Sequence, residues 1–106
     1  MPKYLYQSSY TVEGLKGLLK DGGSKRKEVA KKLVESLGGK LEAFYYAFGG
    51  TDVFLIIDAP DNVSAVAGAM AVTAAGGAAI KTTVLITPEE MDKAVKKKGT
   101  YSPPGK

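Results

Sequence analysis

The chain of 106 residues contains no cysteine and no histidine. Without cysteine it forms no disulfide, and catalysis by a thiol is excluded. Without histidine it lacks the commonest general base near neutral pH and the commonest metal ligand. Zinc sites built from thiolate or imidazole, histidine-ligated haem and serine–histidine–aspartate triads are therefore excluded, and a second copy of the chain restores none of them. We expect no metal and no cofactor.

The sequence also lacks a long hydrophobic run and a strong excess of one charge. No apolar run approaches the ~20 residues of a membrane-spanning helix, and the N-terminal MPKYLYQ has no apolar core like that of a signal peptide. We therefore expect a cytoplasmic protein without a membrane partner. The net charge of +4 is diluted by 11 acidic residues, which predicts no nucleic-acid partner. The lysine-rich runs at 25–27 and 96–98 are of a kind that can bind nucleic acid or anions, but they are interpreted as solvated helix faces or a fraying chain end.

The most informative feature that is present is a pair of apolar strands in the middle of the chain. Residues 43–60, AFYYAFGGTDVFLIIDAP, predict two strands joined by a tight turn at Gly49-Gly50-Thr51-Asp52. A helical pattern lies on each side of this hairpin, and a further strand lies beyond each helix. The order β-α-β-β-α-β is typical of the α+β ferredoxin-like sandwich, also called the split βαβ fold.

The predicted elements form one domain over residues 1–98, followed by a Pro/Gly-rich tail over residues 99–106. Strands are predicted at Lys3–Tyr10, Lys40–Phe48, Val53–Ile57 and Ala79–Thr87. Helices are predicted at about 12–19, 25–37, 63–75 and 88–97, the last being an extra C-terminal helix with Thr87 as its N-cap. The first crossover helix is expected to be broken at Asp21-Gly22-Gly23, with Ser24 capping its second half. The third helix carries almost no charge and is expected to be buried on more than one side.

Two of the predicted strands are apolar on both sides. Val53–Ile57 shows no alternation, which is typical of a strand covered on both faces. In Lys40–Phe48, Phe44 is expected on one side, and Leu41 and Ala43 on the other. Helices cover only one face of such a sheet. We therefore expect a second copy of the chain to cover the other face, giving a homodimer or a higher homo-oligomer.

Three segments together carry a resemblance to a known family: YLYQSSYTVEGLKGLLKDGGSKR, LVESLGGKLEAFYYAFGGTDVFLIIDAPDN and KTTVLITPEEMDKA. In these segments the chain resembles the GYD-domain proteins, a family of small bacterial proteins. The tyrosine of the family's Gly-Tyr-Asp signature is replaced here, since the tripeptide is Gly50-Thr51-Asp52. The resemblance implies a protein of the dimeric α+β barrel type with no assigned function. The wider superfamily includes cofactor-free monooxygenases, isomerases and haem enzymes, but fold analogy alone assigns no chemistry.

Asp52 and Lys81 are the candidate catalytic residues. Asp52 follows a Gly-Gly turn at the start of a strand, where an apolar setting suits a general base. The alternative is a turn residue that accepts hydrogen bonds from nearby backbone N–H groups. Lys81 lies inside the last predicted strand and would attract an anionic ligand or steady an oxyanion. The alternative is an edge lysine that discourages sheet-to-sheet aggregation.

The predicted ligand-binding residues are hydroxyl-bearing side chains of the sheet: Tyr6, Ser8, Tyr10, Tyr46 and Thr83. Phenols line clefts for planar ligands, but they also fill oligomer interfaces, where one end of the side chain is dry and the other wet. The segment Gly22-Gly23-Ser24-Lys25-Arg26 likewise leaves two alternatives open. It cradles a phosphate at a helix start, or it simply caps that helix.

Three functions remain open on these residues. The first is binding of a small molecule in a pocket between the sheet and the helices. The second is a cofactor-free isomerase or monooxygenase, with Asp52 as the base and Lys81 or a tyrosine steadying the developing oxyanion. The third is a structural oligomer or interaction module. A closed, ligand-sized cavity containing Asp52 would favour the second function, and a solid aromatic core would favour the third.

Overall fold

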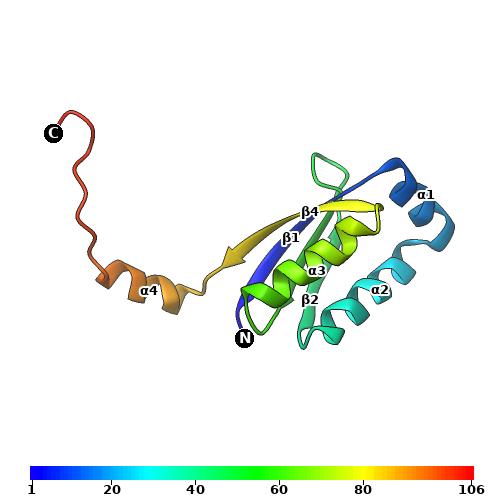
Figure 1. Ribbon diagram of the computed structural model, residues 1–106, viewed down its shortest axis with the longest axis horizontal. Coiled ribbons are helices and arrows are strands. Elements are labelled where there is room, and N and C mark those ends of the chain that lie inside the picture. Colours follow the sequence, from blue (N-terminus) through cyan, green and yellow to red (C-terminus); the bar gives the residue numbers. More distant parts are fainter.

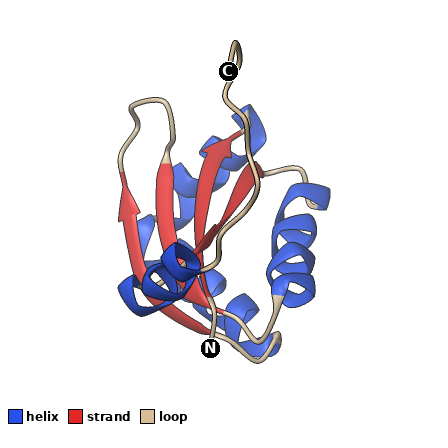
Figure 2. Cartoon of the chain, turned by 90° about the vertical axis from the view of Figure 1, so that its left-hand side faces the viewer, coloured by secondary structure: helices blue, strands red, loops and turns tan.

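Four antiparallel strands form a single sheet in the order β2-β3-β1-β4 (Figures 1 and 2). The computed structural model describes residues 1–106. The strands are β1 Lys3–Tyr10, β2 Lys40–Tyr46, β3 Val53–Asp58 and β4 Ala78–Leu85. β1 pairs with both β3 and β4, and β2 pairs with β3. The predicted ferredoxin-like α+β fold is confirmed, with β2 and β4 at the edges of the sheet.

Four helices accompany the sheet: α1 Val12–Asp21, α2 Gly23–Ser36, α3 Asn62–Ala74 and α4 Pro88–Lys96. The first crossover is broken, as predicted, at Gly22, whose φ of 83° lies in the region that favours glycine. The prediction that Ser24 caps the second half is wrong, because Gly22 is the N-cap of α2 and Ser24 lies inside its first turn. Gly22 both ends α1 and begins α2, which leaves no separate position for a cap. None of the helices has the length and apolarity needed to cross a membrane.

The core lies between the sheet and the two helices on one of its faces, with α3 packed on β4 and α2 on β2 (Figure 1). Tyr4 and Ile57 are its largest fully buried side chains. The Tyr6 hydroxyl donates a hydrogen bond to the Ala65 carbonyl. Gly68 makes room for this contact, because a Cβ there would lie 2.8 Å from the Tyr6 oxygen. Tyr4 and Tyr6 therefore belong to the core and not to an exposed interface.

The predicted faces of β2 need a correction. A register shift between Leu41 and Ala43 makes a β-bulge, so Leu41 lies on the helix-covered face together with Phe44. Strict alternation would have separated these two side chains. The bulge also contains Glu42, whose carboxylate pairs with the Lys3 ammonium at 2.8 Å.

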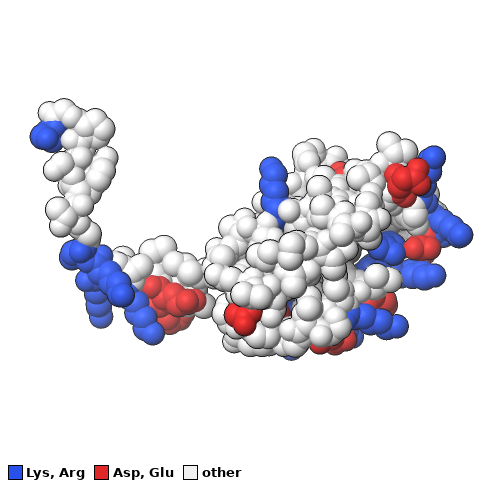
Figure 3. Space-filling model, viewed as in Figure 1, with Lys and Arg blue, Asp and Glu red and all other residues white.

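The prediction that α3 is buried on more than one side is also wrong. Ala65, Gly68 and Ala69 are buried against the sheet, whereas Val63 and Met70 are 78% and 61% exposed. α3 forms the outer layer of the molecule, so nothing else in the chain packs over it. Figure 3 accordingly shows an uncharged surface over α3, with Lys and Arg side chains gathered on the α1–α2 side and on α4.

The other face of the sheet carries no helix, and we call it the open face. Leu5, Phe54 and Ile56 lie at its centre, half-buried by one another. Residues 88–106, which comprise α4 and the tail and are called the arm, project away from the sheet and are all exposed (Figure 1). The arm raises the radius of gyration to 16.8 Å, against about 13 Å for a compact domain of similar length. The single chain thus leaves the open face and the arm without a partner.

Candidate functional site

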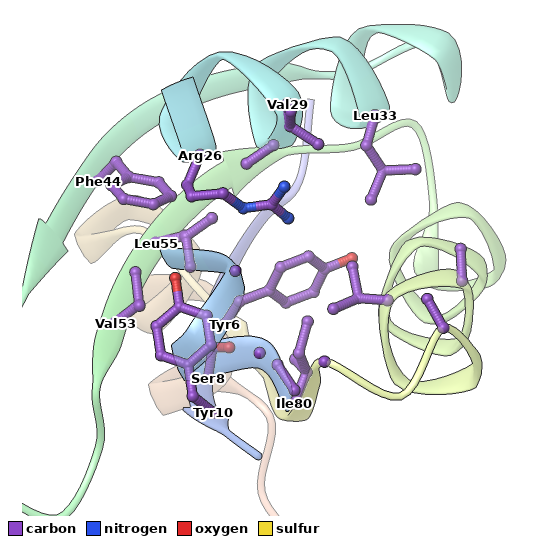
Figure 4. A pocket seen from close by; sticks show the side chains of 18 of the residues that line it. Tyr6, Ser8, Tyr10, Arg26, Val29, Leu33, Phe44, Val53, Leu55 and Ile80 are labelled. Carbon is purple, nitrogen blue, oxygen red and sulfur yellow. The ribbon is translucent and has the colours of Figure 1, made fainter. Parts of the chain in front are cut away.

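A cavity of about 460 Å³ lies between the helix-covered face of the sheet and the helices (Figure 4). It exists because α2 packs over β2 at one edge of the sheet and α3 packs over β4 at the other. A gap remains between the two helices over part of β1 and β3, and side chains of these strands line it. Small-molecule sites commonly have volumes of about 300–1,000 Å³, so the cavity is large enough for a ligand.

One end of the cavity is bounded by α1, which approaches the sheet closely at Gly14. An added Cβ at Gly14 would overlap the carbonyl oxygen of Gly77. That oxygen accepts a hydrogen bond from the Thr11 N–H at 3.0 Å, and the Thr11 hydroxyl donates to the Gly76 carbonyl at 2.7 Å. Gly17 also lines the cavity, but an added Cβ there meets no atom within 4 Å. Of the two α1 glycines that line the cavity, only Gly14 therefore packs against the turn before β4.

The floor of the cavity comes from β1, whose side chains Tyr6, Ser8 and Tyr10 all line it (Figure 4). Most of the wall is apolar, since 14 of the 19 lining residues are hydrophobic. Ser8 is only 7% exposed and lines the cavity, and the chain has no buried side-chain nitrogen or oxygen without a hydrogen-bond partner. A serine hydroxyl in the wall can donate a hydrogen bond to an acceptor on a ligand.

Tyr10, at the end of β1, is held by the β2–β3 loop of residues 47–52. Its backbone N–H donates to the Asp52 carboxylate at 2.8 Å. Its ring stacks on that of Phe48, with the centroids 6.3 Å apart, and Phe48 has a positive φ of 55°. Burial, followed by the neighbouring Tyr46 hydroxyl, raises the pKa of Tyr10 to about 12. The Tyr10 hydroxyl is therefore neutral at physiological pH and can donate a hydrogen bond.

Arg26 is the one charged residue in the cavity wall. Its guanidinium extends from the first turn of α2 into the cavity (Figure 4). The nearest acidic group is Asp21, whose Oδ2 lies 3.4 Å from Nη1 of Arg26. A contact of that length is weak for a hydrogen bond. The guanidinium thus retains capacity for a further partner.

The sequence predictions placed Arg26 in a segment that either cradles a phosphate or caps a helix, and in a run interpreted as a solvated helix face, but they did not place Arg26 in the cavity. Helical spacing is the signal that would have found it. Arg26 lies three residues before Val29 and seven before Leu33, and both of these line the cavity. That period places the three residues on one side of the helix. Lys25 and Lys27 fall outside the stripe and are exposed.

Asp52 does not line the cavity. Its carboxylate accepts the Tyr10 N–H, its own N–H donates to the Ser8 carbonyl at 2.9 Å, and its carbonyl accepts the Ala47 N–H at 2.8 Å. These bonds join the end of β1 to the β2–β3 loop and match the alternative of a turn residue. The role of Asp52 as a general base stays a prediction.

The remaining predicted site residues lie on both faces of the sheet. Three of them line the cavity: Tyr6, Ser8 and Tyr10. Tyr46 lies beside it, with its ring edge-on to that of Phe44 and its hydroxyl donating to the Gly23 carbonyl at 3.0 Å. Lys81 and Thr83 are exposed on the open face of the edge strand β4. The structure therefore separates Lys81 and Thr83 from Tyr6, Ser8, Tyr10 and Tyr46 by the thickness of the sheet.

A comparison with families of known sequence gives a match to the GYD domain over residues 4–95. The matched segment contains helices α1 to α3, β2 to β4, and nearly all of β1 and α4. No curated protein and no solved structure matches the chain. The match therefore covers both the cavity and the open face.

Proposed function

The chain belongs to the GYD domain family, and on that premise we propose that it binds a small, mainly apolar molecule in the cavity between the sheet and the helices. The observation that carries the proposal is the cavity of about 460 Å³ over β1. Its wall is mainly apolar, with a few polar groups converging on it, which is the usual composition of a ligand site. The polar side chains of Ser8, Tyr10 and Arg26 in this wall further support a ligand, because each can donate a hydrogen bond to it.

The composition of the wall favours binding over turnover. Its residues include no carboxylate, and the predicted base Asp52 bonds to the Tyr10 N–H. Burial raises the pKa of both Tyr6 and Tyr10. Near neutral pH these phenols therefore act as hydrogen-bond donors and not as bases. A binding or accessory protein is the function that these groups support best.

A thermal-shift screen of apolar metabolites, each at saturating dose, tests this proposal. A ligand at 100 times its Kd should add about 2.7 kcal/mol of stability. Ala30 lines the cavity, so Ala30→Leu should fill part of it and abolish the shift. Ala74→Leu is the matched control, because Ala74 is exposed at the end of α3 and lies outside the lining. No shift across a broad panel, or a full shift in Ala30→Leu, would overturn the proposal.

We also infer that the protein is a homo-oligomer in which a second copy covers the open face. The apolar centre of that face, Leu5, Phe54 and Ile56, has no cover within the chain. The carboxylates of Asp58 and Glu42 at its margin each lie 2.8 Å from the Lys3 ammonium, which offsets one of their two charges. The arm carries further exposed apolar side chains among its charged ones, with Met91 and Val95 51% and 61% exposed. A helix of nine residues is marginal alone in water, so a neighbouring copy would stabilise it.

Light scattering of the dilute protein tests the assembly. We expect a mass at least twice that of one chain of 11.1 kDa. Phe54→Asp should lower it to a single chain, because an unpaired carboxylate at the centre of an apolar interface is strongly unfavourable. Lys81→Asp is the control, because it places a carboxylate at an exposed position of the same face and should lower the mass less. A wild-type protein of one-chain mass would overturn the inference.

A further inference from the structure

We propose that the cavity selects apolar molecules that carry one anionic head group, and that Arg26 binds this head group. The inference rests on the proposed function, since it assumes that the cavity takes a ligand. The apolar body of the ligand would lie against the hydrophobic wall, and its carboxylate or phosphate oxygens would face the guanidinium (Figure 4).

The first argument is the charge of the wall. Arg26 is its only charged residue, and no carboxylate lines the cavity to neutralise it. Asp21 lies outside the lining and makes only the long 3.4 Å contact with Nη1. Arg26 also stands in the first turn of α2, where the positive end of the helix dipole adds to the same potential. A neutral apolar ligand would remove water from this cation without supplying a hydrogen-bond acceptor in its place.

The second argument is that the polar groups of the wall can all donate hydrogen bonds. The guanidinium has several N–H groups in a planar fork that matches the two oxygens of a carboxylate or phosphate. The Tyr10 hydroxyl keeps its proton at physiological pH. Ser8 lines the cavity, and its hydroxyl is a further hydrogen-bond donor. Three donors around one apolar cavity suit a head group made of acceptor oxygens.

The third argument is geometric separation from the other cations. Lys25 and Lys27 flank Arg26 in sequence but are exposed and do not line the cavity. Their ammonium groups attract anions to this side of the molecule without contacting a bound ligand. Selectivity inside the cavity therefore depends on Arg26 alone among the basic residues of α2.

Three naphthalene probes of matched size test the inference: 2-naphthoate, its neutral analogue 2-naphthamide, and 2-naphthyl phosphate. The chain contains no tryptophan, so naphthalene fluorescence reports binding with little protein background. We expect wild type to bind naphthoate or naphthyl phosphate about 10- to 100-fold more tightly than naphthamide, the range for a hydrogen bond to a charged group. The tighter of the two anions identifies the head group as carboxylate or phosphate, and either result supports the inference.

Two variants locate the effect. Arg26→Gln should weaken binding of the anionic probe by the same factor of about 10 to 100 and leave naphthamide affinity within about threefold of wild type. Unchanged naphthamide binding shows that the cavity still folds in this variant. Lys25→Gln removes the same charge one residue away and also lies near Asp21. It should keep the preference of wild type for the anion.

The outcomes separate this inference from the proposed function. Equal binding of naphthoate, naphthyl phosphate and naphthamide by wild type would overturn the anion selectivity and leave ligand binding intact. An anion preference that persists in Arg26→Gln, or disappears equally in Lys25→Gln, would also overturn the role of Arg26. Failure of every probe and of the whole metabolite panel would overturn both proposals together.

Discussion

The two faces of the sheet are built from the same strands and yet have opposite surroundings. On β3, Ile57 faces the helices and is 2% exposed, whereas its neighbour Ile56 lies on the open face. On β1, Tyr6 lies under the helices and Leu5 on the open face. Both faces are apolar at their centres. The difference teaches that the apolarity of a strand does not locate the functional site, because the site forms where helices cover a face incompletely.

The largest effect should come from comparing Ile57→Ala with Ile56→Ala. Ile57 is packed in the core, so its truncation should cost about 2–5 kcal/mol of unfolding free energy. Ile56 has no helix over it, and its truncation in the isolated chain should cost about 1 kcal/mol or less. Urea unfolding at low protein concentration measures both. Equal losses would show that the open face is as well packed as the covered one.

The next effect separates two glycines of α1 that both line the cavity. Gly14→Ala places a Cβ on the carbonyl oxygen of Gly77 and should cost about 1–3 kcal/mol by overpacking. Gly17→Ala meets no atom within 4 Å and should gain about 0.5–1 kcal/mol from helix propensity. The two changes therefore have opposite signs within one helix. Thermal unfolding distinguishes them, and a stabilised Gly14→Ala would refute the close contact of α1 with the sheet.

A smaller effect concerns pH, and Tyr10 contributes it from the covered face. The pKa of Tyr10 is raised from 10.0 to about 12 in the folded chain. The folded state therefore holds this proton more tightly, and the stabilising contribution is full below the unfolded pKa of about 10 and is lost as pH rises toward about 12. Tyr10→Phe should lose less stability than wild type between about pH 9 and about pH 11. Urea midpoints over this range measure it, and identical losses would contradict the burial of the phenol.

The smallest effect should come from removing the arm. Residues 88–106 are all exposed and pack on no other part of the chain. Their deletion should change the unfolding free energy of the dilute, single chain by less than about 0.5 kcal/mol. Denaturant unfolding of the truncated protein checks this. A loss of several kcal/mol would mean that the arm belongs to the folded body after all.

Much of the fold could be predicted because its signals are local. The Gly-Gly-Thr-Asp turn and the apolar strands on each side of it determine the hairpin without reference to the rest of the chain. Thr87 and Glu90 form the expected capping box, with each side chain accepting the other's backbone N–H. The bulge that moves Leu41 could not be predicted, because it depends on the register between two strands. The cap of α2 was misassigned to Ser24 because Gly22 serves two helices at once.

The candidate site could be predicted only in part. Tyr6, Ser8 and Tyr10, which were predicted from the sequence as ligand-binding candidates, alternate along β1 and all three line the cavity. The cavity itself depends on how far apart α2 and α3 lie, a distance that no local pattern encodes. Arg26 was therefore not distinguished from the neighbouring lysines, although its spacing from Leu33 places both residues on one side of α2. Asp52 stays a prediction as a base, and in the structure it holds backbone groups.

The stacking of Phe48 on Tyr10 gives the β2–β3 loop an influence beyond its own position. This loop contributes no residue to the cavity lining. It nevertheless holds Tyr10, which does line the cavity, through the Phe48 ring and the Asp52 carboxylate. Substitutions among residues 47–52 can therefore change the shape of the cavity without contacting a bound ligand. Two proteins with identical cavity-lining residues could therefore bind different ligands because their β2–β3 loops differ.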